Sequence, residues 1–229
     1  ASSADAQPKI ISLSPSNGPA GTYLTLVGTN FGSAGAGKFL GPLGEEVVAD
    51  TNFPQGCSGT WSDTQITVKV PPYANIGDGK WNVRVERALP KSGLSAPFPF
   101  VFESGIARPG MCSITPNNGP IGTPVSIVGE RFGSQKGDVR FSKEKSVDPG
   151  LTSWSSGQVQ TLTPPGALTG GVQVWTADGV SSTNRLNFQV NDCTVNKSAC
   201  GANAQCCASG SCVPQGTACP GEVKKSVYG

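Results

Sequence analysis

Alternating apolar and polar residues are the clearest pattern in the chain. Ile66, Val68 and Val70 alternate with polar neighbours. A period of two places every second side chain on the same face of a β-strand. The pattern returns in three further runs, whose apolar members are Trp81, Val83 and Val85, then Val172 and Val174, then Leu186, Phe188 and Val190. Gly, Pro, Asn or Ser bounds each run, and these residues favour turns. No window shows a helical period capped at both ends. The pattern therefore predicts an all-β chain of short strands.

The chain also contains an internal repeat. Residues 8–32 match residues 109–133 without a gap, at an offset of 101. Further along, Trp61-Ser62 matches Trp154-Ser155 at an offset of 93, so the second copy is shorter by eight residues (101 − 93) in its middle. A period near 100 residues with strand patterning predicts two antiparallel sandwiches of about seven strands each, rather than a solenoid.

The shared segment has a recognisable motif. Each copy has an opening strand, then Pro-x-x-Gly-Pro-x-Gly-Thr, an apolar strand and Gly-x-x-Phe-Gly. This motif resembles the IPT/TIG family of immunoglobulin-like domains over residues 8–102 and 109–190. The resemblance implies an immunoglobulin-like sandwich for each copy. It leaves the function open, because such domains occur in bacterial surface proteins, animal receptors, polysaccharide-acting enzymes and transcription factors.

Residues of the motif are expected to be structural. Gly18 and Gly21 allow the chain to reverse where a Cβ atom would clash. Pro15 and Pro116 are expected to end the first strand of each copy, and Phe31 and Phe132 to plug one end of each sandwich. The four tryptophans are expected to be core or edge residues. Trp175 lies on the strand face opposite Val172 and Val174, so it is our candidate for a ligand contact.

Six of the eight cysteines lie between residues 193 and 219, spaced C-x6-C-x5-C-C-x4-C-x6-C. About thirty residues cannot build a sufficient core, so disulfides are expected to replace it. Six cysteines allow fifteen pairings, and spacing does not choose among them. The spacing resembles knottin and hevein-like modules, which implies Cys193–Cys207, Cys200–Cys212 and Cys206–Cys219. Metal binding is the rival interpretation, disfavoured because the chain has no histidine and the spacing lacks C-x2-C.

Cys57 and Cys112 remain. Cys57 lies in the segment that the second copy lacks, and Cys112 follows the linker Glu103–Pro109. An even number of cysteines favours a Cys57–Cys112 bond across the domain boundary. The alternatives are two thiols or a bond to another chain. The linker spans only about 20 Å when extended, so the two domains are expected to touch.

Composition narrows the function classes. Without histidine the chain lacks the commonest general base, and it shows no nucleophile elbow, phosphate loop or calcium loop. We therefore expect no enzyme activity, no metal site and no cofactor. A net charge of +2 argues against nucleic acid as a partner, despite the related domains of Rel-type transcription factors. No apolar run is long enough to span a membrane. Asn196 begins the one N-glycosylation sequon, which matters in a eukaryotic host.

These observations predict an organisation and a function. We expect tails at residues 1–7 and 221–229, IPT/TIG domains at 8–104 and 105–190, and a knot-like module at 191–220. Dense cysteines predict an extracellular location, with a signal peptide already removed. The leading hypothesis is a structural or adhesive protein of a cell surface or appendage. It would be part of a filament, with copies of itself, surface proteins or glycans as partners, and the alternative to assembly is a monomeric spacer. The runner-up is a carbohydrate-binding accessory module of a secreted polysaccharide-acting protein.

Overall fold

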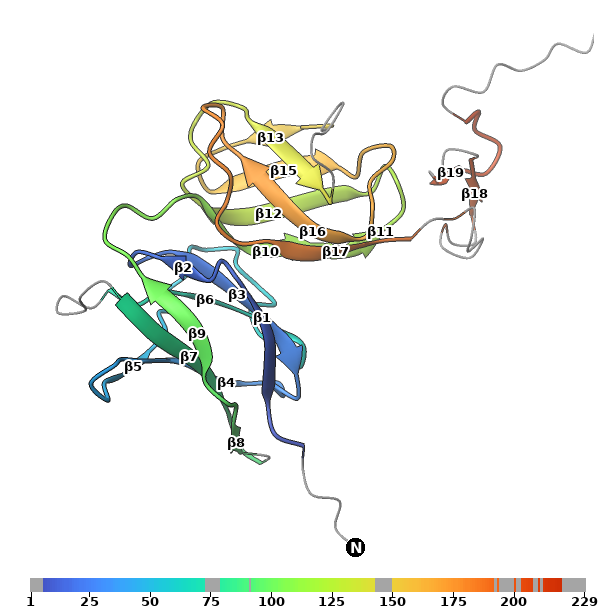
Figure 1. The fold of residues 1–229 in the computed structure, drawn as a ribbon. Helices are drawn as coiled ribbons and strands as arrows, with labels where there is room; N and C mark the ends of the chain where they lie inside the picture. The colour runs from blue at the N-terminus through green and yellow to red at the C-terminus, as the bar shows by residue number, and fades with distance from the viewer. Residues whose placement is uncertain are drawn as a thin grey trace, which may run out of the picture.

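A computed structural model describes residues 6–72, 79–90, 92–142, 150–191, 193, 200, 203–207, 210 and 212–219. It is all-β, as predicted: two tandem sandwiches precede a small disulfide-rich end (Figure 1). The glycosylation sequon at Asn196 and most of both tails lie outside the described residues. In the described part, no helix combines the length and the apolar character that crossing a bilayer requires.

The first sandwich packs a sheet of three strands against a larger one. The order of the smaller sheet is β1-β3-β6, and that of the larger is β2-β9-β7-β4-β5, with β8 also paired to β7. The strands of the smaller sheet are β1 (Lys9–Ser14), β3 (Tyr23–Thr29) and β6 (Gln65–Lys69). Those of the larger sheet are β2 (Asn17–Gly18), β4 (Gly35–Leu40), β5 (Glu46–Val48), β7 (Gly79–Arg87), β8 (Gly93–Leu94) and β9 (Phe98–Phe102).

The second sandwich repeats this plan with two sheets of four strands. Their orders are β10-β12-β15-β14 and β11-β17-β16-β13. The first sheet contains β10 (Gly110–Thr115), β12 (Pro124–Glu130), β14 (Ser153–Trp154) and β15 (Gln158–Leu162). The second contains β11 (Asn118–Gly119), β13 (Asp138–Phe141), β16 (Gly170–Trp175) and β17 (Leu186–Val190).

The apolar members of the alternating runs form the two cores. Ile66, Val68 and Val70 are at most 1% exposed, and Val172 and Val174 are fully buried. Trp81, Val83, Val85, Leu186 and Phe188 are buried as well. Each sandwich has its own apolar cluster between its sheets. The period of two therefore predicted the inward faces of these strands correctly.

In both copies the opening strand crosses from one sheet to the other at a proline. Strand β1 ends at Ser14, before Pro15, and β2 then pairs in parallel with β9 in the opposite sheet. Strands β10 and β11 repeat the crossing around Pro116. Proline has no N–H group to continue the first ladder. The outer strands β1 and β2 of the first sandwich, and β10 and β11 of the second, therefore come from one continuous segment. We call the line between these two sheet edges the seam of the sandwich.

The Gly-x-x-Phe-Gly motif is a packing device. Phe31 and Phe132 are fully buried, which confirms the expected packing role. A Cβ atom on Gly28 would lie 2.4 Å from the Phe31 ring, and one on Gly129 would lie 2.5 Å from the Phe132 ring. Only glycine therefore allows the ring to lie against the strand.

The disulfides of the C-terminal end differ from the expected set. The structure joins Cys200 to Cys212, as the resemblance implied, but pairs Cys193 with Cys206 and Cys207 with Cys219. The expected Cys193–Cys207 and Cys206–Cys219 bonds are therefore wrong in this structure. Cys206 ends β18 (Ala204–Cys206), directly opposite Cys212 in β19 (Cys212–Pro214). Consecutive residues of an extended segment point to opposite sides, so adjacent cysteines can exchange partners without any change in spacing.

Candidate functional site

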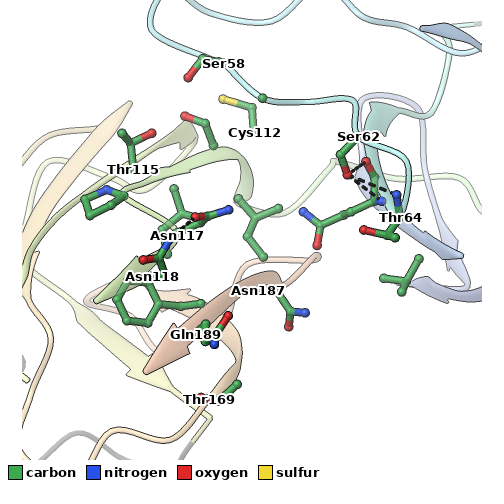
Figure 2. Close-up of a pocket in the computed structure, with 18 residues that line it drawn as sticks. Ser58, Ser62, Thr64, Cys112, Thr115, Asn117, Asn118, Thr169, Asn187 and Gln189 are labelled. Carbon is green, nitrogen blue, oxygen red and sulfur yellow. Dashed lines mark hydrogen bonds between the residues drawn. The ribbon is translucent and has the colours of Figure 1, made fainter. Parts of the chain in front are cut away.

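A groove runs between the two sandwiches beside the seam of the second one (Figure 2). Its volume is about 750 Å³. The first domain contributes the segment from Ser58 to Gln65, and the second contributes β10, β11 and β17. Its polar lining side chains are hydroxyls and amides, and none of the described lining residues is charged. Such a surface can recognise neutral groups that both donate and accept hydrogen bonds.

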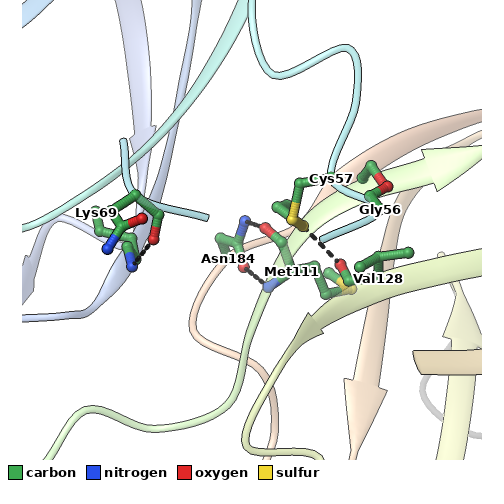
Figure 3. Close-up of a disulfide and its surroundings, with 9 residues drawn as sticks. Gly56, Cys57, Lys69, Met111, Val128 and Asn184 are labelled. Atoms are coloured by element: carbon green, nitrogen blue, oxygen red, sulfur yellow. Dashed lines mark hydrogen bonds between the residues drawn. A yellow bond between two sulfur atoms is a disulfide. The ribbon is translucent and has the colours of Figure 1, made fainter. Parts of the chain in front are cut away.

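Beside the groove, a disulfide and a small apolar cluster hold the domains together (Figure 3). Cys57 is bonded to Cys112, with Cα atoms 5.5 Å apart. Tyr23, Cys112 and Val128 are buried, and Phe53 and Cys57 pack against them. The bond crosses the domain boundary, where the sequence led us to place it. The domains are thus joined covalently at a second point besides the linker.

Buried hydrogen bonds fix the same contact. The Asn184 side chain accepts a bond from the Met111 N–H (2.8 Å) and donates to the Met111 carbonyl (2.7 Å). It also donates to the Thr25 hydroxyl of the first domain at 3.0 Å. The Thr183 hydroxyl donates to the Tyr23 carbonyl at 3.1 Å. These bonds need one relative orientation of the sandwiches, because buried polar groups lose free energy when unpaired.

Arg131 also contributes hydrogen bonds to the contact between the domains. Its guanidinium donates to the Gly21 carbonyl of the first domain at 2.9 Å and to the Arg108 carbonyl at 3.1 Å. It also lies 5.8 Å from the centre of the Tyr23 ring. Burial, followed by the charge of Glu130, raises the pKa of Tyr23 far above its usual range. Tyr23 is therefore neutral at physiological pH and acts as an apolar anchor.

Trp175 does not offer an open stacking surface. The Arg140 guanidinium lies 3.8 Å from the centre of its ring, a cation–π contact that covers one face. The indole N–H is buried without a hydrogen-bond partner among the described residues. Trp175 is also absent from the described lining of the groove. Its role as a ligand contact stays a prediction.

The acidic residues Glu45 and Glu46 have separate structural roles. Glu45 accepts a hydrogen bond from the Leu43 N–H at 2.9 Å in the β4–β5 turn. Glu46 pairs with Lys38 at 2.7 Å and also with Arg84. The hydrogen bond from Lys38 is the main reason that the pKa of Glu46 is lowered, and the bond to Glu46 is the main reason that the pKa of Lys38 is raised. This exposed charge network lies on the first domain and contributes nothing to the groove.

Among the described residues, one group of side chains resembles a metal site, and it consists of three cysteines. The Sγ atoms of Cys193, Cys200 and Cys206 lie within 4.8 Å of one another. All eight cysteines lie among the described residues, and each is in a disulfide. A sulfur atom in a disulfide is not the thiolate that binds zinc. The cluster is therefore explained by covalent bonding.

Sequence reasoning found the disulfide between the domains but missed Asn184, Thr183 and Arg131. Asn184 lies in a polar stretch between β16 and β17 that reads as a turn. Arg131 lies between the motif residues Gly129 and Phe132 and has a positive φ of 64°. Neither position breaks the alternating pattern, so periodicity carries no signal for either. The repeat comparison could have marked them, because a side chain specific to one copy suggests a contact specific to that copy.

Comparison with known proteins identifies the sandwiches. A model of the family described as IPT/TIG domain matches residues 8–102 and 109–190. No curated protein matches the sequence.

Three solved structures show a distant likeness to the chain. Gamma-CGTase from alkalophilic Bacillus clarkii is 16% identical with a TM-score of 0.35, covering 82% of this chain and 26% of that one. SGBP-B from a complex xyloglucan utilization locus in Bacteroides uniformis is 18% identical with a TM-score of 0.28, covering 79% and 49%. The Bacteroides ovatus SGBP-B in complex with a mixed-linkage heptasaccharide is 12% identical with a TM-score of 0.30, covering 82% and 47%. The chain thus spans less than half the length of each, and likenesses this weak say nothing about its ligand.

Proposed function

This chain belongs to the IPT/TIG family of immunoglobulin-like domains, and from that premise we propose that it is an extracellular structural or adhesive protein and not an enzyme. The observation that carries the proposal is the clamped contact between its domains, where the Cys57–Cys112 bond lies beside the buried Asn184 network. A fixed arrangement of two domains is suited to a structural or adhesive protein, which must keep its shape under mechanical force. Four disulfides fit an oxidising compartment.

The contact between the domains gives a rigid pair with a bend. In Figure 1 the long strands of the two sandwiches run in clearly different directions, so the pair is not a straight rod. Tyr23 is replaced by Pro124 in the second copy, and Cys57 lies in the segment that this copy lacks. The second copy therefore lacks the residues with which the first domain makes this contact. Assembly into a filament would need a different surface or an exchange of domains between chains.

Location and assembly state test this proposal. An antibody against the folded protein should label intact cells of the source organism, and treatment of those cells with protease should remove the label. Labelling only after the cells are opened would contradict an extracellular role. Light scattering of the purified protein at increasing concentration separates the two structural readings. Growth in mass indicates assembly, whereas a constant monomer mass indicates a spacer.

The carbohydrate-binding accessory module is the second candidate. The uncharged hydroxyls and amides of the groove are the observation that favours it. Binding of a neutral polysaccharide that is insensitive to salt and weakened by Gln65→Ala would support it. Loss of binding in Trp175→Ala, with Gln65→Ala unaffected, would move the sugar site to the Trp175 face. No binding across a broad panel of glycans would count against this candidate.

A further inference from the structure

One wall of the groove is the open edge of a β-strand. Strand β17 pairs with β16 on one side and with β11 on the other. The β11 strand is only two residues long and pairs only with Gln189 and Val190. The described residues place no strand beside Leu186, Asn187 and Phe188 on that side, and all three line the groove.

The backbone of Asn187 faces this open edge. The N–H groups of Gln189 and Asn191 donate to the Asn117 and Gly119 carbonyls at 2.9 Å, so both point toward β11. Backbone groups of a strand alternate in direction, so those of Asn187 point the same way. The β16 side agrees, because Gly171 lies opposite Asn187 and gives its carbonyl to the Ser142 N–H on the far side. Asn187 therefore presents an N–H and a carbonyl to the groove.

The first domain closes the same position with proline. Asn17 pairs with Val101 as Asn118 pairs with Gln189, which aligns β9 with β17 at an offset of 88. The residue that corresponds to Asn187 is then Pro99. Proline has no N–H group and is a common means of protecting a strand edge from pairing. The edge of β9 in the first domain is therefore blocked by Pro99, whereas the corresponding edge of β17 in the second domain keeps the N–H of Asn187.

On the opposite wall of the groove, formed by β10, the backbone groups of an outer strand do have hydrogen-bond partners. Strand β10 is the outer strand of its sheet, and the Asn184 amide supplies both hydrogen bonds to Met111 there. The Asn184 side chain thus makes the two hydrogen bonds that a neighbouring strand would make to Met111. No comparable side chain among the described residues bonds to the backbone of Asn187.

We propose that the groove binds an extended peptide segment of a partner protein, which adds as a strand beside β17 and pairs with the backbone of Asn187. The segment is uncharged, because the described lining offers hydroxyls, amides and apolar side chains and no ion-pair partner. Main-chain bonds provide the affinity in this mode of recognition, and the flanking side chains provide the selectivity. The inference goes beyond the proposed function, because it does not depend on where the protein is located or whether it assembles.

Selection of peptides tests the proposal. The oxidised full chain is used to select from a random heptapeptide library displayed on phage, and the enriched peptides are synthesised for titration. Asn187→Pro removes the N–H that faces the groove together with the Asn side chain, and Pro99 shows that this fold accepts proline at the corresponding position. We expect the Kd of an enriched peptide to rise at least tenfold in Asn187→Pro. In the matched control Asn187→Ala, which keeps the N–H group, it should stay within about twofold.

Hydrogen exchange gives a second readout that needs no variant. Addition of an enriched peptide to the wild-type chain should slow exchange of the Asn187 amide, because its N–H becomes hydrogen-bonded. Failure to enrich any peptide, equal affinity for the wild type and Asn187→Pro, or unchanged exchange at Asn187 would each overturn the proposal. Direct binding of a neutral oligosaccharide, together with no peptide binding, would instead assign the groove to a sugar.

Discussion

Asn184 contributes one amide to hydrogen bonds in both domains. Its substitution by alanine leaves the Met111 N–H and carbonyl unpaired in a buried position. We expect Asn184→Ala to lower the free energy of unfolding by about 1–3 kcal/mol, the cost of unsatisfied buried polar groups. Urea denaturation measures the change. The exposed Asn187→Ala is the matched control and should change stability by less than about 0.5 kcal/mol. Equal stability of the two variants would show that the Asn184 network is not formed.

Tyr23 gives the same interface a dependence on pH. Its pKa is raised above the ordinary value of 10.0, mainly by burial, so the folded state holds this proton more tightly than the unfolded state. The stabilisation is therefore complete below pH 10 and is lost as the pH rises beyond it. Other groups titrate in that range, so the test is the difference between the wild type and Tyr23→Phe.

The expected difference has two parts. The Tyr23 hydroxyl is buried with no hydrogen-bond partner among the described residues, so Tyr23→Phe should change stability at pH 7 by less than about 1 kcal/mol. Between pH 10 and pH 11.5 the wild type should lose more stability than Tyr23→Phe. Parallel stability curves for the two proteins over that range would contradict the assignment. Denaturant titration at each pH provides the measurement.

Elements were more predictable than contacts. Alternation and the repeated motif predicted two sandwiches, their inward faces and the buried Phe31 and Phe132, because these features depend on local backbone geometry. The crossing of β10 to the second sheet, which creates the groove, follows from Pro116 only when the whole sandwich is known. The contact of the domains depends on Asn184 and Arg131, whose partners are distant in sequence. Composition and periodicity do not encode such pairs.

The disulfide pairing of the C-terminal end also could not be predicted from the sequence. Its cysteine density predicted disulfides, but which of Cys206 and Cys207 faces Cys193 depends on the local path of the chain. We expect tandem mass spectrometry, with fragmentation between Cys206 and Cys207, to link Cys193 to Cys206 and Cys219 to Cys207. A peptide pattern that links Cys193 to Cys207 would restore the pairing implied by the knottin resemblance.

Intact mass should rise by eight hydrogens on full reduction, because the structure has four disulfides.

At the scale of the whole molecule, the bond between Cys57 and Cys112 decides how the protein bears tension. The two cysteines are separated by 55 residues, which include β6 to β9 and the linker between the domains. A force applied to the ends of the chain passes through the disulfide and bypasses this segment. The strands within it are therefore shielded from extension as long as the bond is intact.

Single-molecule pulling from the two ends measures this shielding. At roughly 3.3–3.6 Å per extended residue, the shielded segment hides about 180–200 Å of contour length. The double variant Cys57→Ser with Cys112→Ser should unfold to a contour length that is longer by this amount, under conditions that leave the C-terminal disulfides oxidised. It should also unfold the first domain at lower force, because the bond no longer restrains the contact between the sandwiches. Equal contour lengths would mean that the two cysteines are not joined, and the rigid pair would then depend on Asn184 and Arg131 alone.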